Sequence, residues 1–155
     1  MRRALFIVGL QLFAACAFAD NVSFVRVWPG WRDAEIYMRI SEYFTNRINM
    51  GGHIILRTHA KPRSGFYFLV RVKTDRPLIS GAKFVVSVIV PASPLPETFV
   101  FPTDVPAGGK VYELGLTGGD WPGKQIHPVA WKLDLIGADG RLLATQSSFL
   151  WSKPN

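Results

Sequence analysis

Two runs of alternating apolar and polar residues, separated by a short breaker, constrain the fold of this chain more than any other stretch. They lie within residues 53–73, HIILRTHAKPRSGFYFLVRVK. Apolar residues recur at every second position, which is the period of a strand with one buried face. Pro62 fixes its own φ and Gly65 tolerates a positive φ, so the segment between the runs suits a turn. We therefore predict a β-hairpin in which Leu56 opposes Val70.

In that register the phenylalanines face inwards and the basic and aromatic side chains face outwards, because a slip of one residue would invert a strand. Guanidinium groups bind carboxylates and phosphates through paired hydrogen bonds, so this face suits an acidic ligand. A solvated outer sheet face would carry the same residues. Ile55 and Leu69 also lie on it, which favours partial coverage by a helix or a partner. The candidate binding residues are Arg57, His59, Lys61, Arg63, Tyr67, Arg71 and Lys73.

Strand patterns recur along most of the remaining chain, with prolines and glycines between them. In the first strand pattern, Arg26 and Trp28 share the alternating set of Val22 and Phe24. Apolar spacings of three and four after Asp33 predict the one helix, near residues 33–46. Further strands are expected at 84–90, 98–101, 110–116, 129–136 and 142–151, and the last two are joined by a Gly-Ala-Asp-Gly turn.

Many short strands, one helix and no alternation of strands with helices predict a mainly all-β fold. We expect an antiparallel two-sheet β-sandwich of immunoglobulin-like architecture, with a closed barrel as the alternative. The cysteine and tryptophan spacing of antibody domains is missing, so the likeness concerns architecture alone.

The N-terminus has the pattern of a signal peptide. Arg2 and Arg3 precede an apolar run that ends in Ala17-Phe18-Ala19, a small-x-small cleavage site. We expect residues 1–19 to be the signal peptide and residues 20–155 to form a single domain. Residues 13–16 loosely resemble a bacterial lipobox, so attachment to a membrane is expected only if Cys16 is lipidated. A cysteine-free exported domain favours a bacterial periplasmic or extracellular location.

The charge of the chain is uneven. The whole sequence carries a formal net charge of +7, and the excess of Lys and Arg lies within residues 20–87. Such asymmetry suggests a surface for an acidic partner, although scattered basic residues also serve solubility. Nucleic acid is not expected as the partner of an exported protein.

No sequence motif predicts catalysis or a bound cofactor. The chain lacks the serine elbow, the zinc-binding His-Glu-x-x-His and the glycine-rich phosphate loops. His53 and His59 are too far apart along one strand to bind one metal ion, so we predict no metal site. A small hydrolase or metal-dependent enzyme would have to use His59 or His127 with a loop acid such as Asp120.

Two tryptophans, Trp31 and Trp121, lie in Pro- and Gly-rich loops. Exposed indoles there would stack on sugars, whereas buried ones would close the ends of the core.

Taken together, the signal peptide, the basic strand face and the absence of catalytic motifs predict an exported, non-catalytic binding or assembly module of the bacterial cell envelope that contacts an acidic protein or polysaccharide. A small secreted hydrolase and a carbohydrate-binding module are the alternatives.

Overall fold

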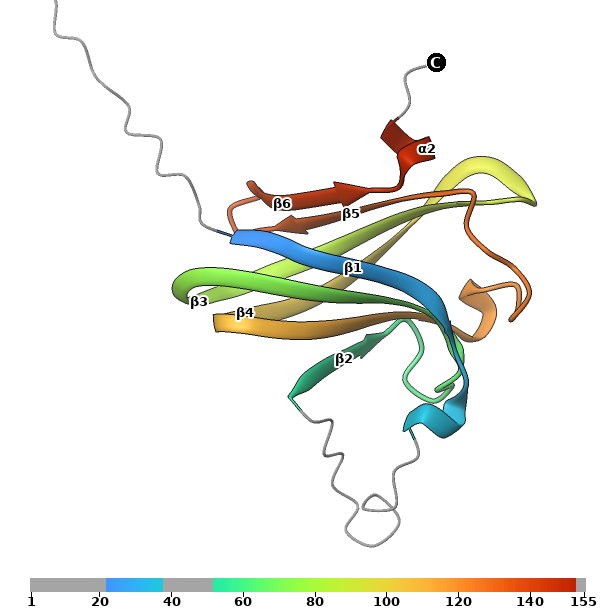
Figure 1. The fold of residues 1–155 in the computed structure, drawn as a ribbon, viewed down its shortest axis with the longest axis horizontal. Helices are drawn as coiled ribbons and strands as arrows, with labels where there is room; N and C mark the ends of the chain where they lie inside the picture. Colours follow the sequence, from blue (N-terminus) through green and yellow to red (C-terminus); the bar gives the residue numbers. More distant parts are fainter. Residues whose placement is uncertain (1–21, 38–51, 153–155) are drawn as a thin grey trace, which may run out of the picture.

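The computed structural model describes residues 22–37 and 52–152 (Figure 1). This part of the chain is mostly strand, as predicted, with only single turns of helix. The predicted signal peptide, the Cys16 site and most of the predicted helix lie outside the described residues. The elements are β1 (Val22–Arg32), η1 (Ala34–Tyr37), β2 (His53–Arg57), β3 (Gly65–Val90), β4 (Ser93–Thr117), η2 (Gly118–Asp120), β5 (Ala130–Ile136), β6 (Leu142–Ser147) and α2 (Phe149–Ser152).

The strands form one six-stranded sheet in the order β2-β4-β3-β5-β6, with β1 paired to β3. The long β3–β4 hairpin is its centre, since all other strands except β6 pair with one of its two arms. The first half of the hairpin, made of the start of β3 and the end of β4, lies between β1 and β2. In the second half, near the turn between the two arms, β5 pairs with β3 and β6 pairs with β5 (Figure 1). All pairs are antiparallel except β2 with β4, which is parallel.

Register shifts in β3 after Thr74 and after Ile79 interrupt its pairing with β4 between the two halves. Bulges of this kind bend a strand and increase its twist. Aromatic contacts join the halves across the core: Phe84 stacks on Phe24 of β1 and contacts Tyr112 of β4, with centroids 6.2 and 4.9 Å apart. One sheet thus folds over a single core cluster. Two separate sheets of immunoglobulin type are not confirmed.

The predicted hairpin of residues 53–73 is wrong. β2 does not pair with β3, because β4 lies between them: Leu56 is opposite Leu114, which is opposite Phe68. The predicted division into faces nevertheless holds, since Leu56 and Phe68 lie on the same side of the intervening strand. The second predicted hairpin is confirmed, because β5 and β6 pair antiparallel around the turn at Gly137 to Gly140.

Prolines are concentrated in the first half of β4, where four of them interrupt the strand pattern (residues 94, 96, 102 and 106). On that stretch β4 pairs with β3 on one side only, since its parallel partner begins to pair at Val111. Proline lacks the N–H of a ladder donor and is confined to such edges, where it also discourages pairing with other chains. The predicted short strand at 98–101 is therefore part of a long edge.

Among the described residues, the predicted helix is represented by the single 3-10 turn η1, which begins after Asp33. The backbone N–H of Ile36 bonds to the carbonyl of Asp33 at 3.2 Å, and the Trp31 indole donates to the Asp33 carboxylate at 2.8 Å. Tyr37 at the end of η1 is buried. In the parts of the chain placed by the structure, no helix has the length and hydropathy to cross a membrane.

Candidate functional site

The outer face of the first half of the sheet carries the predicted basic residues of β2 and β3. Its rows follow the strand register. Arg57, Gly115 and Tyr67 form one row. Four residues further along β3, Arg71 is opposite Val111 of β4 on one side and Arg26 of β1 on the other. Arg71 and Lys73 are exposed, because the residues between and beside them, Val70 and Val72, face the core. The other predicted residues, His59, Lys61 and Arg63, lie on the segment between β2 and β3.

The structure adds two residues of β1 to this face. A bulge after Phe24 shifts the register, so that Phe24 packs on the core while Arg26 and Trp28 turn outwards. The Arg26 guanidinium lies over the Trp28 ring, 4.1 Å from its centroid. Trp28 retains 42% of its surface exposed. We call Arg26, Trp28, Arg71 and Lys73 the basic strip.

The strip brings like charges together. Arg26 and Arg71 are directly opposite on antiparallel strands, a placement that costs roughly 0.2–1 kcal/mol for like charges. Within residues 22–37 and 52–152, none of Arg26, Arg71 and Lys73 has an ion-pair partner. A shallow groove of about 340 Å³ adjoins the strip, and its lining includes Arg71, Lys73, Val25, one acid, Asp75, and the backbone around Gly108. The arrangement suits a ligand with several negative charges.

Arg57 and Tyr67 lie further along the same face, inside a partly buried cluster of polar side chains. Glu113, only 8% exposed, accepts hydrogen bonds of 2.7 Å from the Tyr37 hydroxyl and from His53 Nδ1. The Tyr67 hydroxyl accepts from Arg57 Nε at 2.8 Å and donates to the Arg63 carbonyl at 2.6 Å. We call these six residues, Tyr37, His53, Arg57, Arg63, Tyr67 and Glu113, the polar cluster.

Burial controls the chemistry of the polar cluster. It raises the pKa of Tyr37 far above the usual 10. The Glu113 carboxylate, which accepts a hydrogen bond from the Tyr37 hydroxyl, raises this pKa further. Burial also raises the pKa of Tyr67, although the hydrogen bond from Arg57 opposes it. Both phenols are therefore neutral donors at physiological pH. The Tyr37 ring packs against the Tyr67 ring, with centroids 5.1 Å apart, and the Arg57 guanidinium lies over the Tyr37 ring at 5.0 Å.

The cluster contains one histidine that is open to solvent. His53 retains 40% side-chain exposure while its Nδ1 contacts Glu113. An ionised carboxylate only accepts hydrogen bonds, so Nδ1 carries the proton and Nε2 of the neutral ring keeps a lone pair. A carboxylate that orients an imidazole in this way is the arrangement of a general base. Within the described ranges, no group of three His, Cys, Asp or Glu side chains is placed to hold a metal ion.

His59 and Asp120, named together from the sequence, are also paired: His59 Nε2 lies 3.1 Å from Asp120 Oδ2. Both side chains are partly exposed, at 51% and 31%. The pair is held where the end of β2 meets η2, since the backbone of His59 bonds twice to the Thr117 hydroxyl at 3.0 Å. His127 lies elsewhere, edge-on to Phe66 at 6.3 Å.

The two tryptophans predicted in loops both lie near Phe66 without forming an open aromatic platform, and the prediction is wrong for Trp31, which lies in β1. Trp31 is opposite Phe66 in the β1–β3 register, and the Trp121 ring stacks on the Phe66 ring with centroids 4.4 Å apart. Lys124 ties the two loops together through Asp33, at 2.8 Å. Trp121 is only 5% exposed, and its buried indole N–H has no partner among the described residues. In this conformation Trp121 closes the end of the core.

Sequence reasoning missed Arg26 and Trp28 as outward-facing residues. Strict alternation placed them on the face of Val22 and Phe24, whereas the bulge moved them to the other side. The available signal was the apolar Val27, three residues after Phe24. Both residues pack on the core, and a regular strand places residues three apart on opposite faces, so one extra residue must bulge between them. No known protein family matches this chain. No match to it was found among curated proteins.

Proposed function

We propose that this chain is an exported, non-catalytic binding or assembly module of the bacterial cell envelope, and that it contacts an acidic polysaccharide or protein through the basic strip. The observation that carries the proposal is the cross-strand pair of Arg26 and Arg71. Two like charges face each other on a rigid sheet, and neither has an ion-pair partner in the described part of the chain. An anion that bridges them would remove the repulsion and gain paired hydrogen bonds.

Three other features support a polyanionic partner. Lys73 extends the positive charge along β3, and the groove beside it has room for a chain to continue. Trp28 offers an exposed apolar surface next to a guanidinium group, a combination suited to a ring that carries a carboxylate. The strip lies on strands rather than on loops, so its charges are preorganised. The polar cluster is held by hydrogen bonds between its own members and plays a structural part in this proposal, although Arg57 Nη2 is a buried donor without a partner among the described residues.

The test compares two charge reversals on the same strand. Arg71→Glu inserts an acid into the strip, and Lys83→Glu makes the same change at an exposed residue on the second half of β3. Binding to immobilised polygalacturonate and to poly-glutamate is measured against salt, with neutral dextran as a blank. We expect salt-sensitive binding that Arg71→Glu weakens about tenfold, since hydrogen bonds to charged groups contribute roughly 1.5–3 kcal/mol. Equal effects of both substitutions, or no retention on either polymer, would contradict the proposal.

A second candidate is a small secreted hydrolase, because two histidine–carboxylate pairs are open to solvent. His53, oriented by Glu113, would act as the general base that activates water. The test is hydrolysis of a panel of nitrophenyl esters and glycosides by the whole protein and by His53→Gln, with His127→Gln as the control. Turnover that disappears only in His53→Gln would favour the hydrolase, and absence of turnover on the whole panel would leave the binding module as the stronger proposal.

A further inference from the structure

The outward-facing residues of β1 and β3 form successive rows across the basic strip. Alternate residues of a strand point to the same face and lie about 7 Å apart, so the rows repeat at that spacing. In order along the strands, the paired residues are Trp28 with Leu69, Arg26 with Arg71, and Ser23 with Lys73. The face therefore presents an apolar row, then a row with two guanidinium groups, then a row with one ammonium group.

The cations of the strip form a short track beside the groove. Lys73 is the last of them on β3, because the next residue of that strand to line the groove with it is an acid, Asp75. The groove is mainly apolar where it borders β1 and β4: Val25, at the bulge, is 55% exposed, and Gly108 contributes backbone alone. This shape leaves room for an extended chain that lies along the rows.

We infer that the partner at the basic strip is an extended acidic peptide in which one apolar side chain and two carboxylates occupy alternate positions, an assignment that rests on the proposed binding function. An extended peptide has the same rise as a strand, so its alternate side chains share one face and repeat at about 7 Å, as the rows do. A polysaccharide carries its charges at the repeat of its sugar rings, which has no relation to the rise of a strand.

Each row receives one side chain of the peptide. The apolar side chain packs on Trp28, 42% of whose surface stays exposed even with the Arg26 guanidinium over its ring. The first carboxylate lies between Arg26 and Arg71 and removes their repulsion. The second pairs with Lys73. Within the described ranges, none of these three cations has an ion-pair partner of its own.

The experiment is an NMR titration of the ¹⁵N-labelled protein with two peptides of identical composition. In the first, a phenylalanine and two glutamates follow one another with one threonine between each. In the second, the two glutamates are adjacent, so an extended chain directs them to opposite faces. We expect the first peptide to bind about tenfold more tightly, because only it places a carboxylate on each cationic row. Amide shifts are expected in residues 22–28 and 69–75.

A double-mutant cycle tests the register of the peptide on the strip. Replacing the glutamate farther from the phenylalanine by glutamine should weaken binding to the unmutated protein about tenfold, but should have little further effect on Lys73→Met. Lys83→Met makes the same change at an exposed residue in the second half of β3 and should leave the tenfold loss intact. Equal losses with all three proteins would overturn the alternating register.

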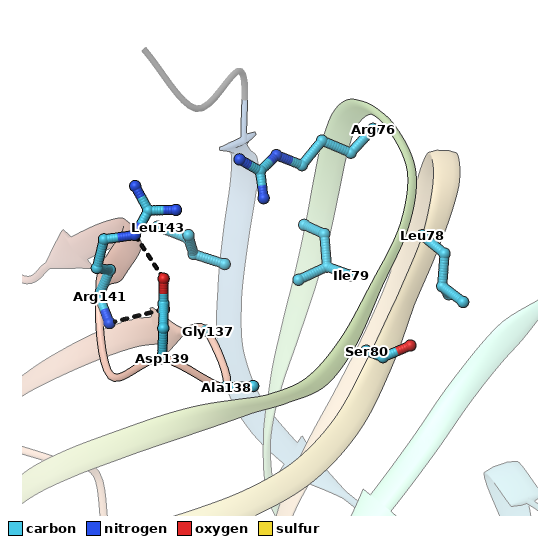
Figure 2. A pocket seen from close by; sticks show the side chains of 9 residues that line it. All are labelled: Arg76, Leu78, Ile79, Ser80, Gly137, Ala138, Asp139, Arg141 and Leu143. Atoms are coloured by element: carbon cyan, nitrogen blue, oxygen red, sulfur yellow. Dashed lines mark hydrogen bonds and ion pairs between the residues drawn. The ribbon is translucent and has the colours of Figure 1, made fainter. Parts of the chain in front are cut away.

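The molecule contains its own control for a general attraction of acids to arginines. Figure 2 shows a pocket of about 280 Å³ at the bend of β3, which is lined by Arg76 and Arg141 among others and shares no residue with the strip. Arg141 pairs there with Asp139 at 2.6 Å. Shifts in residues 76–80 and 137–143 as large as those in the strip would overturn the assignment of the peptide to the strip.

Two outcomes separate the peptide partner from the binding function itself. Equal binding of the two peptides would overturn the alternating peptide, and retention on polygalacturonate in the same protein would leave the polyanion-binding strip standing. Absence of binding to polygalacturonate, to poly-glutamate and to both peptides would overturn the two together. Both results are read from the unmutated protein, so neither depends on the folding of a variant.

Discussion

A side chain at residue 115 would occupy space that the Tyr67 ring already fills. Glycine is required there because a Cβ would overlap three carbon atoms of that ring. Tyr67 has no exposed surface and bonds to Arg57 and Arg63, so it has little room to move. We expect Gly115→Ala to lower the free energy of unfolding by about 1–3 kcal/mol, the usual cost of overpacking. Urea denaturation measures it.

The matched control for this substitution is Gly109→Ala on the same strand. A Cβ at residue 109 meets only the Val72 carbonyl oxygen, at 3.9 Å. Its stability should be unchanged or slightly higher, because alanine reduces the conformational freedom of the unfolded chain. If the two variants were equally stable, close packing of Tyr67 against the glycine backbone would not be what requires residue 115 to lack a side chain.

Glu113 holds the polar cluster together by accepting from two different elements. In Glu113→Gln the amide retains one acceptor oxygen and presents an NH₂ group to the second donor, Tyr37 or His53. We expect the substitution to cost roughly 1–3 kcal/mol of stability, because a buried donor is left without an acceptor. Glu97→Gln, an exposed change on the same strand, should cost nothing measurable in parallel thermal unfolding. A loss of the same size in both variants would rule out the buried acceptor as its cause.

Among the elements, β2 shows most clearly what local patterns miss. Its alternation correctly predicted a strand and a buried face, but β2 pairs with β4, which is more than fifty residues further along the chain. Turn residues around Pro62 favoured a hairpin, and consecutive strands do pair in most proteins. The decisive interactions are instead non-local: the Thr58 backbone N–H bonds to the Gly115 carbonyl at 3.0 Å. No short sequence window contains both partners.

The end of β2 is fixed to β4 by the hydroxyl of Thr117, which is fully buried and bonds to both the N–H and the carbonyl of His59. Thr117→Val keeps the shape of the side chain and removes both bonds. We expect a loss of about 1–3 kcal/mol, since two buried backbone groups lose their partner. The local consequence is faster amide exchange at His59 than in the unmutated protein, measured by NMR.

Thr98→Val is the control for that change, because Thr98 lies on the exposed part of β4 and its hydroxyl bonds only to the hydroxyl of Ser87 among the described residues. It should leave both the stability and the exchange rate at His59 unaltered. Rapid exchange at His59 in both variants would contradict a specific role for Thr117, and protection retained in Thr117→Val would show that β2 is held mainly by its ladder.

For the whole molecule, alternation was sufficient to predict a mostly β chain with a basic outer face. It was insufficient to predict one sheet folded over its own centre, because the bend of β3 depends on bulges that have no strong sequence signal. The same limit applied to the basic strip: Arg26 reached it through a bulge in β1. The polar cluster joins Tyr37 to Glu113, 76 residues later in the sequence, so it could be recognised only from the tertiary structure.

Alkaline pH should weaken the whole fold, because three of its tyrosines are buried as neutral phenols. Burial raises the pKa of Tyr112 to about 12 and shifts Tyr37 and Tyr67 in the same direction. The unfolded chain then loses these protons first, so stability is complete below pH of about 10 and falls as the pH rises towards the folded values. The slope is up to about 1.4 kcal/mol per pH unit for each tyrosine.

The contribution of one phenol can be separated by Tyr112→Phe, which removes the hydroxyl that donates to the Asp104 carbonyl at 3.0 Å. At neutral pH this variant should be about 1 kcal/mol less stable, from the lost hydrogen bond. Between pH 10 and 12 its free energy of unfolding should fall less steeply with pH than that of the unmutated protein, because one titrating group has been removed. The difference in slope is at most about 1.4 kcal/mol per pH unit, measured in denaturation series at each pH. Phe101→Leu, a core change without a titrating group, should lower stability by the same amount at every pH. Parallel slopes in all three proteins would mean that Tyr112 ionises in the folded state as freely as in the unfolded chain, and its burial would then not account for the alkaline weakening.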